Sequence, residues 1–135
     1  MVKIILASKS KVRKQILDKN SISTEVQGSN LDEDVVKESL LKERASPELI
    51  SKNLAELKAN KVSQKNQGFL VIGADSVIDL EGELISKPIN RDQALEILKK
   101  LNGKRHLLIS SVCISQNGVM TVSYTHLTLP TTPYV

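Results

Sequence analysis

Apolar runs and helical patterns alternate along the first half of the chain. Val2–Leu6, which Lys3 interrupts once, and Phe69–Ile72 are short apolar runs of the length that buried strands have, and Ile22–Val26 favours a further short strand. Ser10 follows the first run and is a suitable N-cap for a helix. Ser46-Pro47-Glu48 predicts the start of another helix, because a cap, a first-turn proline and a first-turn acid coincide there.

The remaining segments predict one more helix, a hairpin and a further strand. The charge-rich segment 28–45 indicates a loop with one or two helical turns. Glu81-Gly82 lies between two apolar runs and predicts a hairpin, and Asn90 is a suitable cap for a helix. Leu107–Ser115 predicts a strand that ends at a tight turn over Asn117-Gly118. The face of the last helix that we expect to be buried consists of Ala94, Leu95, Leu98 and Leu101.

Length and charge narrow the class of protein. A chain of 135 residues suits one compact domain, and the alternation of strands and helices predicts an α/β fold. The 19 Lys and Arg residues are interspersed with 15 Asp and Glu residues, which argues against a protein that coats DNA and leaves room for a basic pocket. The longest apolar runs are too short to span a membrane, and the amino terminus lacks a signal-peptide pattern. The lone Cys113, in an apolar run, predicts core packing and a cytoplasmic protein.

The last fourteen residues differ in composition from the rest of the chain. Val122–Val135, which reads VSYTHLTLPTTPYV, contains no charged residue, whereas residues 1–121 contain every Lys, Arg, Asp and Glu. Val122–Leu129 favours a strand. The same string also resembles a translated sequencing-adapter sequence. Our interpretation is that residues 1–121 are the natural domain and that residues 122–135 are a non-native tail.

One candidate site lies where the first strand leads into the first helix. Free backbone N–H groups and the positive end of the helix dipole favour phosphate at such a junction. Ser8 and Ser10 add hydroxyl groups, and Arg13 can bind a phosphate or a carboxylate with two parallel hydrogen bonds. The alternative is an ordinary capped helix with solvated basic side chains.

Acidic residues and two lysines supply a second set of candidates. Asp75 comes just after the strand Phe69–Ile72, where it can hold Mg²⁺ and orient or deprotonate a water. The segment Asp32-Glu33-Asp34 can complete a divalent-metal site, and Lys58 and Lys87 can neutralise phosphates. The alternatives are a turn aspartate, a solvated acidic loop and two surface lysines.

Six motifs occur in order over residues 2–121. They are LASKSKVRKQIL at the start, Asp32-Glu33, Leu54-Ala55 with Lys58-Ala59, Gly73-Ala74-Asp75-Ser76-Val77, Gly82-Glu83 with Lys87-Pro88, and Leu101-Asn102-Gly103 with His106 and Ser110-Ser111-Val112. Together, and at these spacings, they resemble the Maf (septum-formation-like) nucleotide pyrophosphatases.

The resemblance implies both a fold and an activity. The fold is a mixed sheet with flanking helices and a cleft between two lobes, similar to that of the inosine-triphosphate pyrophosphatases. The activity is hydrolysis of a nucleoside triphosphate to the monophosphate and pyrophosphate, with Mg²⁺ or Mn²⁺. By this resemblance Asp75 is the proton acceptor and a metal ligand, and Glu33 is a second metal ligand. The residues implied in triphosphate binding are Ser8, Ser10, Arg13, Lys58 and Lys87.

The chain departs from the family pattern at positions that bear on base preference. Val12 stands where an arginine accompanies dTTP or UTP specificity, and Ser76 follows Asp75 where threonine is common. Both differences leave the choice of base open, and the absence of the arginine at Val12 shifts the expected substrate toward a modified or methylated purine nucleotide. The family's later section, with its specificity glutamine, is not found, so we expect an incomplete second lobe, a C-terminally truncated chain and reduced activity. The resemblance is also compatible with a homodimer, and with a protein that binds neither nucleic acid nor membrane.

Two alternatives remain open from the sequence. An inosine-triphosphate-type pyrophosphatase has a similar strand–loop–helix phosphate site, although Asn and Lys normally stand where Ser8 and Ser10 are found here. A non-catalytic nucleotide- or RNA-binding module would use the basic first helix. Before residue 122 the chain has a single aromatic residue, Phe69, which disfavours base stacking.

Overall fold

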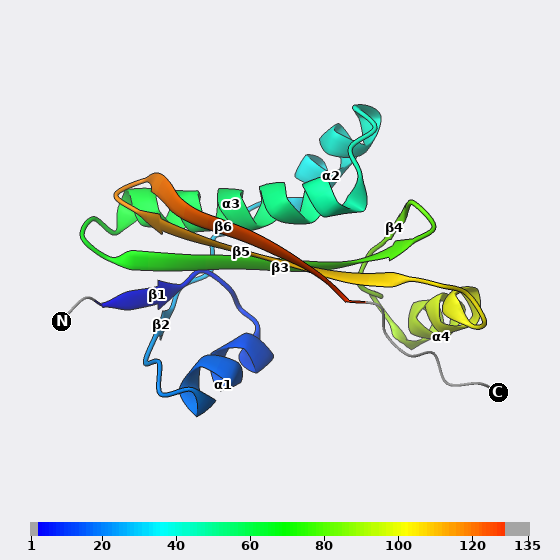
Figure 1. The fold of residues 1–135 in the computed structure, drawn as a ribbon, viewed down its shortest axis with the longest axis horizontal. Coiled ribbons are helices and arrows are strands. Elements are labelled where there is room, and N and C mark those ends of the chain that lie inside the picture. Colours follow the sequence, from blue (N-terminus) through cyan, green and yellow to red (C-terminus); the bar gives the residue numbers. More distant parts are fainter. Residues whose placement is uncertain (1–2, 129–135) are drawn as a thin grey trace.

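The computed structural model describes residues 3–128, which form a six-stranded mixed sheet with helices on both faces (Figure 1). The strands are β1 (Ile4–Leu6), β2 (Glu25–Val26), β3 (Leu70–Leu80), β4 (Glu83–Ile85), β5 (Leu107–Gln116) and β6 (Val119–Thr128). The helices are α1 (Lys11–Lys19), α2 (Glu33–Lys42), α3 (Pro47–Lys65) and α4 (Arg91–Leu101). Within this range, no helix combines the length and the apolar character that crossing a membrane requires.

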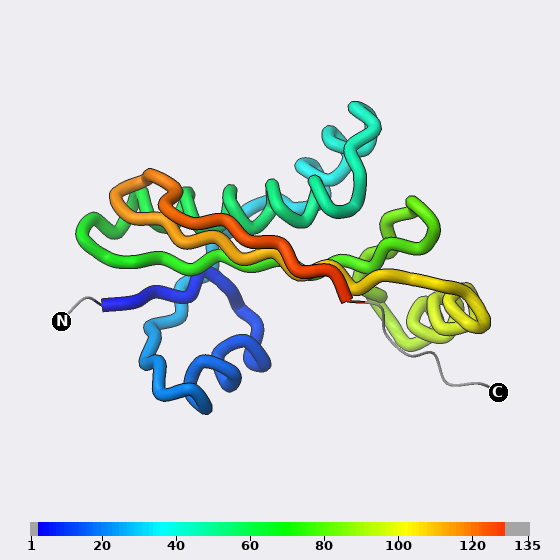
Figure 2. Tube along the Cα trace, viewed as in Figure 1, coloured from blue at the N-terminus to red at the C-terminus, as the bar shows by residue number. Residues whose placement is uncertain are grey.

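The sheet is organised around β3. Its order is β2-β1-β3-β5-β6, with β4 paired to the far end of β3. The strand β1 runs parallel to β2 and β3. The strand β3 pairs antiparallel with β4 and with β5, and β5 pairs antiparallel with β6. Figure 2 shows β3, β5 and β6 as one long twisted ribbon, with α1 and the two short parallel strands at one end. The predicted α/β class with flanking helices is confirmed.

The predicted helix starts are confirmed in detail. Ser10, Ser46 and Asn90 are N-caps, and each side chain accepts a hydrogen bond from the backbone N–H three residues later, at 3.3, 3.2 and 2.9 Å. Each cap satisfies a helix N–H that has no partner inside the helix. The turn between β5 and β6 has positive φ at Asn117 (53°) and Gly118 (77°), as a two-residue hairpin turn requires.

The helix α2 takes up more of residues 28–45 than the one or two helical turns that we expected beside a loop there. Asp32 caps it by accepting from the N–H of Val35, and Glu33 and Asp34 fill its first turn, where acids stabilise the helix dipole. None of its ten residues is buried. The prediction of only one or two helical turns was therefore wrong, because capping and dipole contacts support a helix that lacks a buried face.

The prediction of a buried face on α4 was wrong for most of that face. Leu101 is 9% exposed and packs with Leu80 and Ile85, whereas Leu95 and Leu98 are 52% and 64% exposed. The helix lies beside the far end of β3 and β4, so only its last turn meets the sheet (Figure 1). Helical spacing predicts which side chains share a face, but it does not show what covers that face.

The strand β3 is longer than the apolar run that predicted it. It continues from Leu70 to Leu80, so Asp75 lies mid-strand, where it is the register partner of Ser111, and not at a strand end as we expected. Gly73 interrupts the apolar pattern, but ladders to neighbouring strands keep the backbone extended there. The predicted position of Asp75 at a strand end was therefore wrong.

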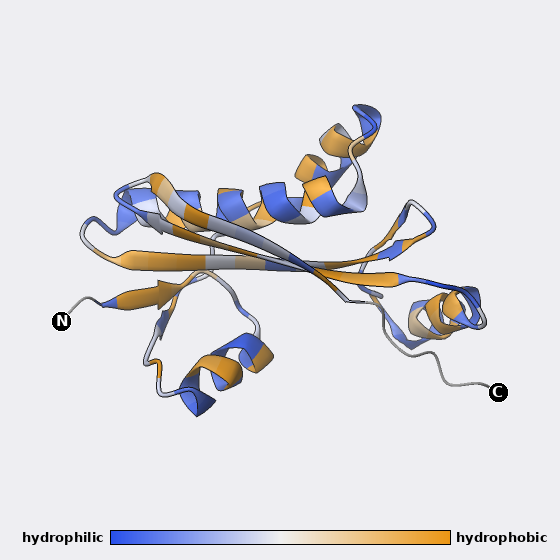
Figure 3. Ribbon diagram, in the orientation of Figure 1, coloured by the Kyte–Doolittle hydropathy of each residue, from blue (hydrophilic) through white to orange (hydrophobic). Residues whose placement is uncertain are grey.

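The core lies between α3 and the sheet. The buried face of α3 meets the buried faces of β3 and β5, and Cys113 packs on it with no exposure, as its apolar surroundings predicted. Figure 3 shows β1 and the first half of β3 as strongly apolar, whereas α3 alternates between apolar and hydrophilic positions. The buried apolar residues of α3 are Ile50, Leu54, Ala55, Ala59 and Val62.

Gly73 is the point of closest approach between α3 and β3. A Cβ added there would collide with the carbonyl oxygen of Ala55 and lie 2.7 Å from the nitrogen and 2.8 Å from the Cβ of Ala59. Two of these three atoms belong to the helix backbone, so no side-chain rotation relieves the contact. Glycine is therefore required for the helix to lie this close to the strand.

The boundary that we predicted near Thr121 falls within β6. This strand pairs with β5 from Gln116↔Val119 to Leu108↔Thr128, with an irregularity at Ile114/Ser115. The pairing does not bear on where residues 122–135 originate, so their non-native origin stays a prediction. Residues 129–135 lie outside the described part of the chain.

We expect Gly73→Ala to destabilise the fold by about 1–3 kcal/mol, the usual cost of overpacking a core. Urea unfolding followed by circular dichroism measures this change. Adding Ala59→Gly should restore little, because the carbonyl of Ala55 and the nitrogen of residue 59 remain in place. An unchanged unfolding midpoint for Gly73→Ala would contradict the close approach.

Candidate active site

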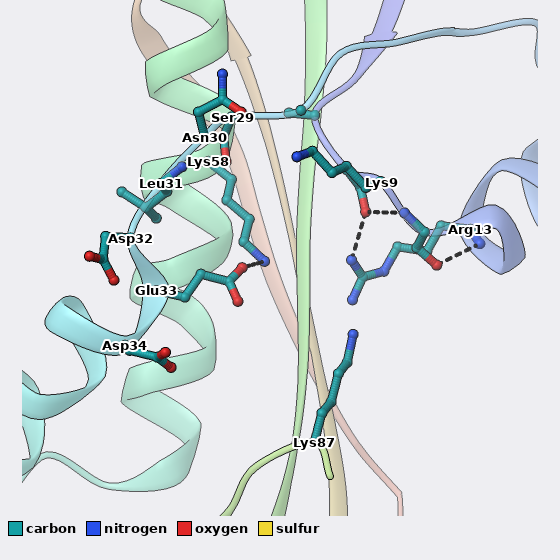
Figure 4. A pocket seen from close by; sticks show the side chains of 14 residues that line it. Lys9, Arg13, Ser29, Asn30, Leu31, Asp32, Glu33, Asp34, Lys58 and Lys87 are labelled. Carbon is teal, nitrogen blue, oxygen red and sulfur yellow. Dashed lines mark hydrogen bonds and ion pairs between the residues drawn. The ribbon is translucent and has the colours of Figure 1, made fainter. Parts of the chain in front are cut away.

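A cavity of about 600 Å³ opens between α1 on one side and α2 and α3 on the other. It brings together residues from four separate segments of the chain, namely 7–13, 28–34, Lys58 and Lys87 (Figure 4). Its lining consists of Ala7, Ser8, Lys9, Ser10, Arg13, Gly28, Ser29, Asn30, Leu31, Asp32, Glu33, Asp34, Lys58 and Lys87. Every predicted triphosphate-binding residue is in this lining, although Asp75, Val12 and Ser76 are not.

The first wall is built by the loop between β1 and α1. The N–H of Ala7 donates to the carbonyl of Ile72 at 2.8 Å, which ties the start of this loop to β3. The Arg13 guanidinium turns back from α1 and donates from Nη1 to Ser8 Oγ at 2.9 Å. Ser8 Oγ also accepts from the N–H of Ser10 at 3.2 Å. These bonds hold a guanidinium and two hydroxyl groups beside the start of a helix.

The opposite wall holds a buried ion cluster. Lys58 extends from α3, and its Nζ lies 3.3 Å from Asp75 Oδ1 and 3.3 Å from the carbonyl oxygen of Ala74. The same Nζ forms an ion pair with Glu33 Oε1 at the start of α2. The side chains of Lys58 and Asp75 are 10% and 8% exposed, so the pair lies almost out of water. Ser51 Oγ donates to the carbonyl of Asp75 at 3.2 Å and steadies the strand there.

The sequence predicts Asp75 and Lys58 separately, and their contact follows from the packing of α3 on β3. Gly73 and Asp75 face the same side of the strand, since they are two residues apart. Lys58 stands next to Ala59, which touches the Gly73 backbone. The close approach at Gly73 therefore places the lysine over the aspartate.

The pKa values of the two carboxyls, Asp75 and Glu33, are shifted in opposite directions. Burial raises the pKa of Asp75, and the charge of Lys58 and its hydrogen bond offset this only in part. Partial burial also acts to raise the pKa of Glu33. There the hydrogen bond and charge of Lys58, with the charges of Lys37 and Lys87, outweigh it and hold that pKa below its usual value. Lys58 thus favours the ionised form of Glu33 on α2, while burial disfavours the ionised form of Asp75 on β3.

Lys87 completes the cationic side of the cavity. It follows β4 and extends toward Arg13, on the other side of β3 from Glu33 and Lys58 (Figure 4). The lining thus has positive groups on both walls and carboxylates concentrated on one. Such a division suits a ligand that carries several negative charges and a metal ion.

Two residues predicted to influence base preference lie outside this lining. Val12 is 63% exposed on α1. Ser76 follows Asp75 in the strand and so faces the opposite side of the sheet, where its Oγ lies 3.1 Å from Ser110 Oγ. Their predicted role is not supported by contact with the cavity and stays a prediction.

The loop 28–31 and Lys9 were missed as site residues. Asn30 has a positive φ of 55°, and its carbonyl accepts from Lys61 Nζ at 3.1 Å, which fixes the loop above α3. A Cβ on Gly28 would lie 2.6 Å from Lys9 Cε, so the lysine stem crosses the glycine directly. The turn-forming string Gly28-Ser29-Asn30 was the available signal for a loop at a binding site.

The chemistry of the carboxylates fits a divalent metal. Asp75 Oδ2 is buried and has no hydrogen-bond partner, which is a costly state for a carboxylate oxygen. Within residues 3–128 no three metal-binding side chains converge. Glu33 and Asp75 would therefore supply one or two oxygen ligands, which is the number that Mg²⁺ usually takes from protein.

Comparisons with known proteins agree on the family. The family model described as Maf-like protein matches residues 3–132. The chain is 68% identical over 126 residues to a nucleoside triphosphate pyrophosphatase of Pelagibacter ubique, covering 93% of this chain and 65% of that protein. It is 37% identical over 131 residues to a 7-methyl-GTP pyrophosphatase of Brucella abortus, covering 95% of this chain and 66% of that protein.

A solved structure has a similar fold. The Ham1 protein of Staphylococcus aureus matches with a TM-score of 0.60 and 17% sequence identity, over 94% of this chain and 70% of that protein. The chain spans slightly less than two thirds of the length of the two curated relatives described above. Similarity to pyrophosphatases thus covers most of this chain and only part of each relative.

We expect the pKa values of the two carboxyls to be shifted in opposite directions. The pKa of Asp75 should lie above the ordinary aspartate value of 3.8, and that of Glu33 below the ordinary glutamate value of 4.5. Ionisation of Glu33 then contributes stability that is lost as the pH falls through its folded-state pKa. Ionisation of Asp75 instead costs stability as the pH rises through its raised pKa.

Carbon-13 NMR of the side-chain carboxyls, followed against pH without metal, measures both values. A pKa for Asp75 below 3.8 would show that Lys58 outweighs burial.

Proposed function

The chain belongs to the Maf-like protein family, and from this premise we propose that its cavity binds a nucleoside triphosphate and hydrolyses it to the monophosphate and pyrophosphate. The observation that carries the proposal is the ion cluster of buried Lys58 and Asp75 with partly exposed Glu33, opposite Arg13. Cleavage between the α and β phosphates needs positive charge over several phosphate oxygens and one activated water. The two walls of the cavity provide these separately.

The cationic side of the cavity is proposed to bind the triphosphate. Arg13 is already oriented by Ser8, so its planar guanidinium can donate hydrogen bonds to two phosphate oxygens with little loss of side-chain entropy. Ser10 and the backbone N–H groups around it lie at the start of α1, where the helix dipole favours anions. Lys87 extends toward Arg13 and is proposed to bind the same triphosphate, so that the two residues form a clamp on it.

Asp75 is proposed to accept the proton of the attacking water. Its backbone is paired with β5 and its carbonyl accepts a hydrogen bond from Ser51, so the carboxylate extends from a fixed backbone position. Its raised pKa brings it nearer to the working pH, which improves a general base. When bound by Glu33 and Asp75, Mg²⁺ or Mn²⁺ would neutralise charge on the phosphates and on the leaving pyrophosphate.

The substrate is proposed to be a modified or methylated purine nucleoside triphosphate. Val12 stands in place of an arginine, which favours such a substrate over dTTP or UTP. One relative bears the name 7-methyl-GTP pyrophosphatase. Because Val12 and Ser76 lie outside the cavity, the loop 28–31 is the better candidate for contacts with the base. An inosine-type nucleotide is the second candidate, since the structural neighbour from Mycobacterium abscessus is named a dITP/XTP pyrophosphatase.

The cellular setting is also part of the proposal. The single, buried Cys113 is compatible with a reducing compartment, and we place the protein in the cytoplasm on that basis. The mixed charge of the chain gives no support to nucleic-acid or membrane binding. A homodimer is proposed from the family resemblance alone.

We expect pyrophosphate release from at least one member of a nucleotide panel of UTP, dTTP, GTP, 7-methyl-GTP and ITP. Release should need Mg²⁺ or Mn²⁺, and Asp75→Asn should lower it by about 100-fold or more, because a positioned base is lost. A coupled phosphate assay after inorganic pyrophosphatase measures the rate. Undiminished release by Asp75→Asn would remove Asp75 from the reaction.

We expect Arg13→Ala and Lys87→Ala each to lower kcat/KM by about 2–4 kcal/mol of transition-state stabilisation, since the bound triphosphate removes both groups from water. Lys65→Ala is the matched control, because Lys65 is exposed at the far end of α3. Equal losses in all three variants would mean that general charge, rather than the clamp, supports binding.

A further inference from the structure

Lys58 already occupies the position between the two candidate metal ligands. An ammonium group has three N–H donors, and Lys58 directs them at Glu33, Asp75 and the carbonyl of Ala74. All three donors are therefore used within the protein. In this arrangement Lys58 has no donor left for a phosphate, although family resemblance assigns it to phosphate binding.

We propose that Lys58 is an exchangeable internal cation, which holds Glu33 and Asp75 in the metal-free protein and is released by a divalent metal to bind the triphosphate. The inference rests on the proposed function in one respect only, namely that a divalent metal binds these carboxylates. It adds an order of events, because the metal frees the lysine before the lysine reaches the substrate.

The balance of charge supports an exchange. Two carboxylates share the single ammonium of Lys58, and the Lys58–Asp75 pair is nearly closed to water, whereas the side chain of Glu33 is 39% exposed. A divalent cation would neutralise both carboxylates, and it would repel the ammonium strongly at such short range. The metal and Lys58 therefore compete for the same oxygens.

The unused oxygen of Asp75 supports the same conclusion. Lys58 contacts only Oδ1, while Oδ2 is buried and unpartnered. Burial of a carboxylate oxygen without a partner costs free energy, and a metal ion bound to that oxygen would recover it. The cluster is thus incompletely satisfied by the lysine and has a place ready for a second cation.

The surrounding structure allows Lys58 to move without moving Asp75. The backbone of the aspartate is held by Ser51 and by the ladder to β5, neither of which involves the lysine. The lysine has a flexible four-carbon stem and lines the cavity, so rotation of its side chain is sufficient. The exchange therefore requires no change in the fold.

The first test measures Mn²⁺ binding without nucleotide, at a mildly alkaline pH, by the loss of the free Mn²⁺ electron-spin-resonance signal. We expect Lys58→Met to bind Mn²⁺ about five-fold or more tightly than the unaltered chain, because the competing cation is gone. Lys52→Met, at an exposed position of the same helix, should bind like the unaltered chain. Unchanged or weaker binding by a folded Lys58→Met protein would overturn the proposal.

The second test needs no variant, so it stands even where Lys58→Met fails to fold. Lysine acetylation of the unaltered chain is followed by mass spectrometry with and without Mg²⁺. We expect labelling of Lys58 to rise severalfold with Mg²⁺, while Lys52 and Lys65 do not change. Equal labelling of Lys58 in both conditions would overturn the exchange.

These tests separate the exchange from the proposed function. Absence of pyrophosphate release from every nucleotide would refute the activity and would leave both metal measurements intact. Conversely, pyrophosphate release by the unaltered chain, together with an Mn²⁺ affinity that is the same in Lys58→Met, would refute the exchange alone.

Discussion

The contact between the backbone of α3 and the backbone of β3 at Gly73 is the constraint on which this structure depends. The absence of a side chain there lets the helix lie against the centre of the sheet. The same contact fixes the height of Lys58 above Asp75, two residues along the strand. Core packing and the ion cluster are therefore one feature, and a change in helix–sheet spacing would alter both.

Local signals were sufficient to predict much of the fold. The caps at Ser10, Ser46 and Asn90 and the turn at Asn117-Gly118 depend on a few adjacent residues, and all are present. The errors concern tertiary context. The length of β3 through Asp75 depends on pairing with distant β5, and the exposure of α4 depends on where the sheet ends. Neither is encoded in a short window of sequence.

The candidate site shows the same division. Family motifs identified Arg13, Glu33, Lys58 and Lys87, and these residues line one cavity. The saturation of the Lys58 ammonium was not predictable, because its three acceptors come from α2 and β3. The opposite orientations of Asp75 and Ser76 follow simply from strand geometry, once the strand is known to continue through them.

The position of Asp75 in the middle of β3, paired with β5, has a consequence for changes in the length of this strand. One residue inserted or deleted before Asp75 would turn the carboxylate to the other face of the sheet, away from Lys58. A bulge would have to absorb the change, and it would disrupt the ladder to β5. Length variation among homologues should therefore be excluded from this strand and concentrated in the turns, such as the one at Glu81-Gly82. The register of the strand, as well as its residues, thus determines the face of the sheet on which the carboxylate lies.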